Sequence, residues 1–174
     1  MHLNRRFDAK RTTLPLAFAL AILAPTGALA QSTDTGATPN PWGTQCSGQS
    51  RLGVLECSME QQLVLQETGQ FLARILIRVP SDADAPVYLI QLPLRISIPV
   101  GISLSVDEVP LSNLSFQTCD ATGCFAGGTM SSQNIQAMKA GNNLTLNFDD
   151  GANRPISLDF SLQGFSKAFG DIEK

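Results

Sequence analysis

The fold class is decided by one alternating stretch, residues 144–162, LTLNFDDGANRPISLDFSL. A period of two places every second side chain on the same face of a β-strand. The turn-forming residues Asp149-Asp150-Gly151 separate the two alternating halves. The residues that follow them lack the spaced acidic residues of an EF-hand calcium loop. We therefore predict two strands joined by a hairpin loop rather than a calcium loop. The apolar positions are Leu144, Leu146, Phe148, Ile156, Leu158, Phe160 and Leu162.

The same period recurs along the rest of the chain. It marks Phe71, Ala73, Ile75, Ile77 and Val79, then Ile102, Leu104 and Val106, and then Leu114 and Phe116. The segment 87–98 is long, apolar and rich in β-branched residues. Pro93 within it favours a sheet edge, a bulge or a bend. Short strands separated by turns predict an all-β fold, an antiparallel β-sandwich or a partly closed barrel of about seven to nine strands.

Two segments depart from this period and predict one or two short helices. Ser131 or Ser132 can cap a helix that runs through Ile135 and Met138 and ends at Gly141. Its apolar positions suit a helix that covers one end of the sheet. A second helical turn is predicted near residues 166–169.

Residues 1–30 have the features of a secretory signal peptide. Basic residues precede an apolar run at 14–23, which is shorter than the about 20 residues of a membrane span. Ala28 and Ala30 form an A-x-A site, so cleavage is predicted before Gln31, where a lipoprotein would carry Cys. Arg5-Arg6 also fits a twin-arginine signal, although the general secretory route is favoured.

The exported part is predicted to begin with a disordered leader, residues 31–41, because this stretch is polar, contains Pro and Gly and lacks periodicity. Residues 42–174 then form a single domain. The predicted location is beyond the inner membrane, in the periplasm, on the outer surface or outside the cell, with no transmembrane span in the mature protein.

Removal of residues 1–30 changes the chemistry that the chain can perform. The only histidine, His2, is lost, which excludes Ser-His and Cys-His mechanisms and imidazole metal ligands. The remainder has 8 Lys and Arg against 14 Asp and Glu, which argues against nucleic acid and against attraction to anionic lipid headgroups. We expect no cofactor, no metal and no catalytic site, with carboxylate, Ser/Thr or Tyr88 chemistry as the enzymatic alternative.

Four cysteines remain after this removal: Cys46, Cys57, Cys119 and Cys124. In an exported protein they predict disulfides, and four cysteines allow three pairings. Short, turn-rich loops favour Cys46–Cys57 and Cys119–Cys124, without excluding the other two. The spacing fits neither a zinc knuckle nor a C-x-x-C redox pair. Trp42, which precedes the first cysteine, is predicted to pack over its disulfide.

For two further motifs, a structural role is favoured over a binding site. Gly127-Gly128 lacks the strand, loop and Lys of a phosphate site and is predicted to be a turn. Arg74, Arg78 and Arg95 could form a weakly cationic face, but a solvated strand face is the favoured interpretation.

Several short motifs in a fixed order resemble the invasion-associated locus B family of alphaproteobacterial exported proteins. They are Trp42-x₃-Cys46, Cys57-x-Met59-x-Gln61, Leu92-Pro93, Pro99-x-Gly101-Ile102-Ser103-Leu104-Ser105-Val106-Asp107, Phe116-x-x-Cys119-x₃-Gly123-Cys124-x-Ala126, Lys139-x-Gly141 and Ser161-Leu162-Gln163-Gly164-Phe165-x-x-Ala168. The resemblance covers about residues 42–172. It implies an exported all-β protein of the bacterial envelope, named for a role in host-cell entry, with no established catalytic residues.

Three classes of function follow. The leading hypothesis is an envelope protein without catalytic activity that binds or supports a protein or cell-surface partner and assists host-cell interaction or invasion. The alternative is a periplasmic carrier or chaperone for a lipid, peptide or outer-membrane client, with Val87–Leu94 lining its groove or pairing with a client strand. The third is an enzyme, which requires a convergent cluster of acids. An edge strand would also allow a homodimer.

Overall fold

A computed structural model of the chain describes residues 40–48, 55–83 and 85–173. All of them belong to one unit, Thr38–Lys174. The predicted signal peptide, its cleavage site at Ala28, Ala30 and Gln31, and residues 31–39 of the leader lie outside the described residues.

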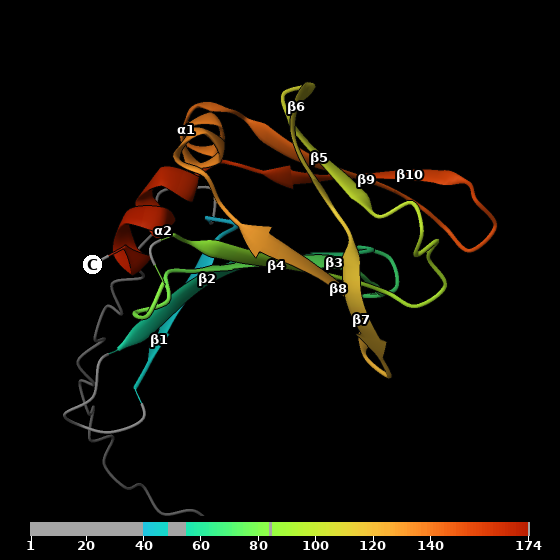
Figure 1. Cartoon of the computed structure of the whole chain (residues 1–174), viewed down its shortest axis with the longest axis horizontal. Coiled ribbons are helices and arrows are strands. Elements are labelled where there is room, and N and C mark those ends of the chain that lie inside the picture. Colours follow the sequence, from blue (N-terminus) through green and yellow to red (C-terminus); the bar gives the residue numbers. More distant parts are fainter. Residues whose placement is uncertain (1–39, 49–54, 84, 174) are drawn as a thin grey trace, which may run out of the picture. The chain divides into compact units, whose positions relative to one another are not determined.

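Two antiparallel sheets contain the ten strands found among the described residues (Figure 1). Sheet 1 has the order β1 (Gly43–Ser47), β2 (Glu56–Val64), β3 (Phe71–Arg78), β4 (Val87–Leu92), β8 (Gly123–Thr129) and β7 (Phe116–Asp120). Sheet 2 has the order β10 (Pro155–Ser161), β9 (Asn143–Asp149), β5 (Ile102–Val106) and β6 (Val109–Leu114). The predicted β-sandwich is confirmed, and the sheets do not close into a barrel.

The strand number exceeds the predicted seven to nine for two physical reasons. Every residue of β1 is exposed, so this strand has no apolar alternation that the sequence could reveal. Residues around Leu114 and Phe116 form two strands, β6 and β7, which Ser115 separates. Because β6 belongs to sheet 2 and β7 to sheet 1, this segment makes a corner between the sheets, as strands that switch sheets do.

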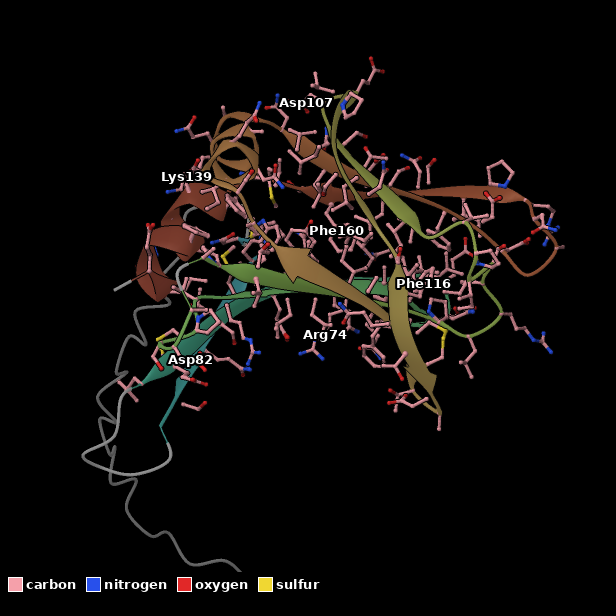
Figure 2. The ribbon with its side chains drawn as sticks, in the orientation of Figure 1. Arg74, Asp82, Asp107, Phe116, Lys139 and Phe160 are labelled. Carbon is pink, nitrogen blue, oxygen red and sulfur yellow. A yellow bond between two sulfur atoms is a disulfide. The ribbon has the colours of Figure 1, made fainter. Side chains whose placement is uncertain are left out.

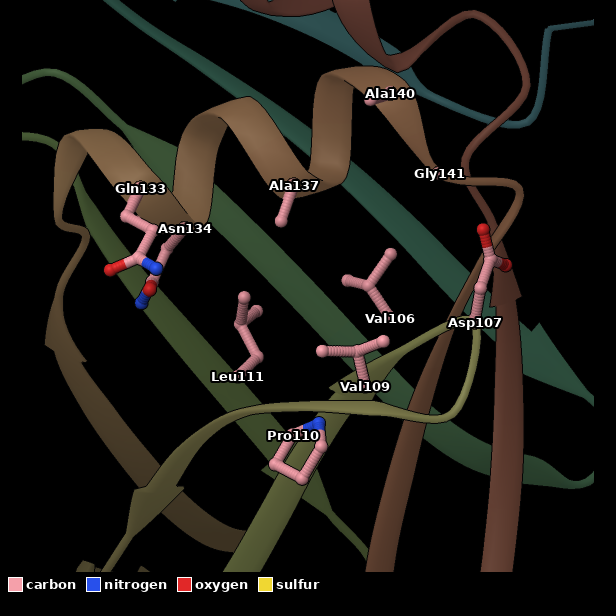
Figure 3. A pocket seen from close by; sticks show the side chains of 10 residues that line it. All are labelled: Val106, Asp107, Val109, Pro110, Leu111, Gln133, Asn134, Ala137, Ala140 and Gly141. Atoms are coloured by element: carbon pink, nitrogen blue, oxygen red, sulfur yellow. The ribbon is translucent and has the colours of Figure 1, made fainter.

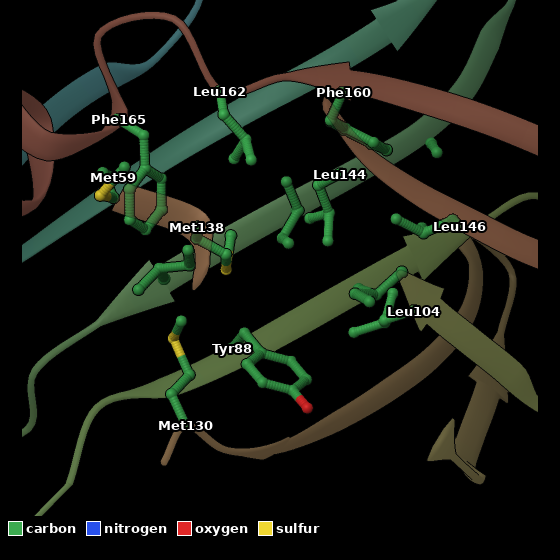
Figure 4. Close-up of a cluster of buried hydrophobic side chains, with 14 of the residues drawn as sticks. Met59, Tyr88, Leu104, Met130, Met138, Leu144, Leu146, Phe160, Leu162 and Phe165 are labelled. Atoms are coloured by element: carbon green, nitrogen blue, oxygen red, sulfur yellow. The ribbon is translucent and has the colours of Figure 1, made fainter. Parts of the chain in front are cut away.

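The core lies between the inner faces of the two sheets, as Figures 2 and 4 show for Phe160 and its neighbours. The period-two prediction is confirmed on both sides. In sheet 1, Ala73, Ile75 and Ile77 are at most 1% exposed, and in sheet 2 Leu144, Leu146 and Phe160 are fully buried. The predicted hairpin at 144–162 is β9 and β10, paired from Pro155 opposite Asp149 to Ser161 opposite Asn143.

The apolar segment 87–98 resolves into two parts at Pro93. Strand β4 ends at Leu92, and its alternate residues Tyr88, Ile90 and Leu92 are buried in the core. Strand β4 lies inside sheet 1, between β3 and β8, so Pro93 marks a bend at the end of a strand and not a sheet edge.

Two helices cover one end of the sandwich. Helix α1 (Ser132–Ala140) begins after Ser131, whose hydroxyl accepts a hydrogen bond from the Asn134 N–H at 3.1 Å, and ends at Gly141, as predicted. Helix α2 (Phe165–Ile172) is longer than the predicted single turn. Its apolar face is buried and consists of Phe165, Ala168, Phe169 and Ile172.

The described contacts of Trp42 join the start of the domain to helix α2. Its ring meets the ring of Phe165 edge to face, with centroids 5.2 Å apart, and its Nε1–H donates to the Ser161 carbonyl at 2.9 Å. The prediction placed Trp42 over the first disulfide, whereas these contacts are with α2 and the end of β10.

The prediction of a turn at Gly127-Gly128 is wrong, because both residues lie within β8. They face Leu89 and Tyr88 of β4 in the register of the sheet. A Cβ atom at Gly127 would lie 2.9 Å from the Tyr88 carbonyl oxygen, and one at Gly128 would lie 3.2 Å from the Leu114 side chain. These glycines therefore serve the close packing of neighbouring chain segments.

The cysteines lie at the two edges of sheet 1. Cys46 on β1 faces Cys57 on β2 with sulfurs 2.05 Å apart, and Cys119 on β7 faces Cys124 on β8 with sulfurs 2.09 Å apart. Each pair thus ties an edge strand to its inner neighbour. Among the described residues, no group of three or more His, Cys, Asp or Glu is placed to hold a metal.

Truncation of Phe160 tests the shared core. The Phe160→Ala variant should lose about 3–5 kcal/mol of unfolding free energy, because the side chain is fully buried between the sheets. Ser157→Ala is the matched control on the same strand, since Ser157 is exposed, and it should cost less than about 1 kcal/mol. Urea denaturation measures both variants, and equal losses would contradict this packing.

Peptide mapping without reduction tests the cysteine pairing. Cleavage at Arg51 and before Asp120 separates both pairs of cysteines, so linked peptides should join Cys46 to Cys57 and Cys119 to Cys124. The Cys119→Ala/Cys124→Ala variant should lose about 2 kcal/mol, as the loop-entropy relation gives for so short a loop. Peptides joining Cys46 to Cys119, or four free thiols, would refute the pairing.

Candidate binding groove

The enzymatic alternative depends on a convergent cluster of acids, and two of the described carboxylates, Asp120 and Asp150, hold local turns instead. Asp120 accepts hydrogen bonds from the hydroxyl and the N–H of Thr122, both at 2.7 Å. Asp150 accepts from the Arg154 N–H at 3.0 Å and the Ala152 N–H at 2.8 Å. The hydroxyl of Thr122 and the N–H of Arg154 are the main causes that lower the pKa values of these two carboxyls.

Tyr88, the one residue named singly in the enzymatic alternative, has a structural role in the sandwich. It is 4% exposed on the inner face of β4, and its hydroxyl lies 2.9 Å from the Ser112 hydroxyl on β6. Buried tyrosines need such a partner for the phenol oxygen. The pair therefore stabilises the contact between sheet 1 and sheet 2.

A groove lies between helix α1 and the β5–β6 hairpin (Figure 3). Its volume is about 500 Å³. The residues that line it come from two segments of the chain and are mostly apolar. They are Val106, Asp107, Val109, Pro110, Leu111, Gln133, Asn134, Ala137, Ala140 and Gly141.

Small residues of helix α1 leave the groove open. In Figure 3 the short side chain of Ala137 points toward Leu111 and Val106 across the groove. At the end of the helix, a Cβ atom on Gly141 would clash with a methyl group of Val106. Glycine at this position therefore lets the helix end approach β5 closely.

The hairpin turn that bounds the groove is fixed by one carboxylate. Asp107 and Glu108 form a two-residue turn with φ values of 46° and 70°, a conformation that favours Asn, Asp or Gly at the first position and Gly at the second. The Asp107 carboxylate accepts hydrogen bonds from the N–H groups of Asn142 and Asn143, each at 2.9 Å, and the Asp107 N–H donates to the Asn143 carbonyl at 3.0 Å. These bonds anchor the turn to the loop that follows α1.

The same hydrogen bonds set the charge state of this carboxylate. The N–H of Asn142, followed by that of Asn143, lowers the pKa of the Asp107 carboxyl below its ordinary value, because both bonds favour the charged form. One end of the groove is therefore anionic at neutral pH, while the amides of Gln133 and Asn134 lie in the lining contributed by the start of α1.

The arrangement of the groove suits the binding of a ligand. Its lining has one carboxylate, two amides and otherwise apolar side chains, and β6 beside it is an edge strand of sheet 2. An extended peptide or aliphatic side chains are the ligands that such a surface accepts. The sequence did not reveal this site, since residues 106–111 and 133–141 meet only in the folded chain. The small residues Ala137, Ala140 and Gly141 were the feature of the sequence that could have indicated a groove beside this helix.

Another groove lies on the outer face of sheet 1 and bears on the carrier hypothesis. Its volume is about 480 Å³, and its lining includes Val87, Leu89, Gly127 and Arg78. The cationic face, the less favoured interpretation of Arg74, Arg78 and Arg95, is not assembled here, because Arg74 forms an ion pair with Glu60 and Arg95 lies in the loop after β4. The inner residues of β4 belong to the core, so Val87–Leu92 does not line an open interior.

No helix of the described part of the chain has the length and apolar character needed to cross a membrane.

Comparisons with known proteins agree on one family. The family model described as Invasion associated locus B (IalB) protein matches residues 42–173. Two invasion protein B homologs of Brucella abortus, from strain 2308 and from biovar 1 strain 9-941, are each 28% identical over 164 residues, which cover 91% of this chain and 93% of theirs. The crystal structure of invasion associated protein B from Bartonella henselae superposes with a TM-score of 0.67 at 22% identity, over 77% of this chain and 92% of that one.

The charge of Asp107 should make part of the stability depend on pH. Because its folded pKa is lowered, the carboxylate stabilises the fold above the unfolded pKa, and this contribution disappears as the pH falls through the folded value. Asp107→Asn should therefore be less stable than the wild type at neutral pH, and the difference should shrink at acid pH. Unfolding free energies measured at both pH values test this.

Glu108→Gln is the matched control, because it removes the same charge from the other residue of the turn. A loss of stability that is equal in the two variants, or that persists unchanged at acid pH, would show that the Asp107 hydrogen bonds do not anchor the hairpin.

Proposed function

The chain belongs to the invasion-associated locus B family, and from this premise we propose that it is an exported envelope protein that binds a partner without catalysing a reaction. In this proposal a signal peptide of residues 1–30 and a leader of residues 31–41 precede a single β-sandwich domain of residues 42–174.

Export is supported by the cysteines and by the N-terminal sequence. Both cysteine pairs lie at disulfide distance, and disulfides persist in oxidising compartments such as the periplasm and the cell exterior. Ala28 and Ala30 supply the cleavage site before Gln31. Location beyond the inner membrane, in the periplasm, at the outer surface or outside the cell, is part of the proposal.

The groove between α1 and the β5–β6 hairpin is the observation that carries the binding function. It is apolar, about 500 Å³ in volume, and bounded by a turn that Asp107 anchors. Its edge strand β6 allows an extended segment of a partner to lie beside it. Three carboxylates that a histidine-free enzyme could use, Asp107, Asp120 and Asp150, are engaged in hydrogen bonds that hold turns.

The class of partner follows from the relatives. The Brucella abortus proteins are named invasion protein B homologs. We infer from this name a protein partner of the envelope or of a host-cell surface, and a role in host-cell interaction.

The carrier or chaperone function is the second candidate, favoured by the groove on sheet 1. Leu89 is 39% exposed there, opposite Gly127, so an apolar client could lie across β4 and β8. Mass spectrometry of the native exported protein should then detect a bound lipid or peptide that Leu89→Asp releases. Protein that is empty after gentle extraction would eliminate this candidate.

Complementation of a gene deletion tests the leading function. The deletion strain should show a defect under envelope stress or in a host-contact assay, and the wild-type gene should restore it. Ala137→Met fills the groove with a larger side chain and should not restore it, although the variant is exported and folded.

Gln136→Met is the matched control, because Gln136 is the neighbouring residue of α1 and faces solvent. This variant should complement as the wild type does. Full complementation by Ala137→Met would exclude the groove as the binding site, and a deletion without any phenotype would count against a partner-binding role in the envelope.

A further inference from the structure

Exposed aliphatic side chains gather at one end of the sandwich. Eight large hydrophobic side chains are exposed among the described residues, and five of these come from two neighbouring connections. We call these five residues the apolar end. They are Val64 (38% exposed) and Leu65 (41%) at the β2–β3 turn, and Leu94 (50%), Ile98 (45%) and Val100 (57%) in the β4–β5 loop.

The register of sheet 1 places both connections at the same end. Val64 pairs with Phe71 at the β2–β3 turn, and Arg74 pairs with Gln91, so the end of β4 lies beside the start of β3. Helices α1 and α2 lie at the opposite end, as Figure 1 shows, and Leu55 lies just before the start of β2 there. One end of the sandwich is therefore covered by helices, while the other presents aliphatic loop tips.

The β4–β5 loop is held firmly, so the exposure of its side chains belongs to the folded state. Ile96 forms an isolated bridge with Asp150, and the Ser97 N–H donates to the Asp149 carbonyl at 2.8 Å. The Gly151 N–H donates to the Arg95 carbonyl at 2.7 Å. These backbone bonds fix the loop against the β9–β10 hairpin and aim Leu94, Ile98 and Val100 outward.

The chemistry of the apolar end favours lipid over protein. A standard protein interface buries about 20–30 residues on each side and centres on aromatic or Arg anchors in pockets. The apolar end has five exposed aliphatic residues, and none of the exposed large hydrophobic side chains among the described residues is aromatic, so it lacks the aromatic anchors of a stable interface with a second copy. The charged residues of the β2–β3 turn, the β4–β5 loop and the tip of the β9–β10 hairpin nearly balance. They are Arg95 and Arg154 against Glu67, Asp149 and Asp150.

We propose that the apolar end docks onto the surface of a phospholipid bilayer, with Leu94, Ile98 and Val100 inserted at the boundary between headgroups and acyl chains. Aliphatic side chains on a surface element bind at this depth without spanning the membrane. Binding depends on their insertion and not on net charge. This docking goes beyond the proposed partner binding and leaves the α1 groove, at the other end, free.

Vesicle flotation tests the docking. The protein is purified after export, its intact mass is recorded, and it is mixed with vesicles of phosphatidylethanolamine and phosphatidylglycerol. The wild type should float with the vesicles, and Leu94→Ser/Ile98→Ser/Val100→Ser should lose partitioning by about tenfold or more, which corresponds to about 1.4 kcal/mol. Ile98→Ser alone should show a smaller loss.

Leu55→Ser is the matched control, since Leu55 is 63% exposed but lies away from the apolar end. It should float as the wild type does, and so should Ala137→Met, which separates this proposal from the groove. Wild-type protein that does not float, or a triple variant that floats equally, would overturn the proposal. Sedimentation that shows a wild-type dimer lost in the triple variant would make the apolar end an interface between copies and overturn it too.

Discussion

The structure depends on the burial of two facing sheet surfaces against each other. Strands β3 and β4 contribute Ile75, Ile77 and Ile90 from one side, and β9 and β10 contribute Leu146 and Phe160 from the other. Neither sheet can exclude water alone, because each has one apolar and one polar face. Helices α1 and α2 complete the burial at one end, where Phe165 and Phe169 enter the core.

The location of function follows from this burial. A core filled from both sheets leaves no interior site at β4, and the carboxylates near turns are engaged in hydrogen bonds that hold loops in place. The two surfaces on which the proposals rest lie at opposite ends of the sandwich: the groove beside α1 and the apolar end around Ile98. A protein docked on a bilayer by one end would present the other to a partner, which is the working arrangement that we infer.

The sequence predicted those features that depend on local pattern. The alternation at 144–162 identified the β9–β10 hairpin, and Ser131 and Gly141 marked both ends of α1. The prediction from sequence failed where apolar and polar side chains do not alternate, as at Gly127-Gly128, which lie in β8 and not in a turn. It could not find the groove or decide the exposure of Ile98, because both depend on segments that meet only after folding.

Photo-crosslinking in intact cells tests most directly whether the protein acts through these two ends. A photoreactive residue at Val109 reports on the rim of the groove, one at Ile98 on the apolar end, and one at Leu55 on an exposed site outside both. If the protein acts through both ends, Val109 should give a protein adduct, Ile98 a lipid adduct and Leu55 no discrete adduct. The same adduct from all three positions, or none from Val109 and Ile98, would contradict this expectation.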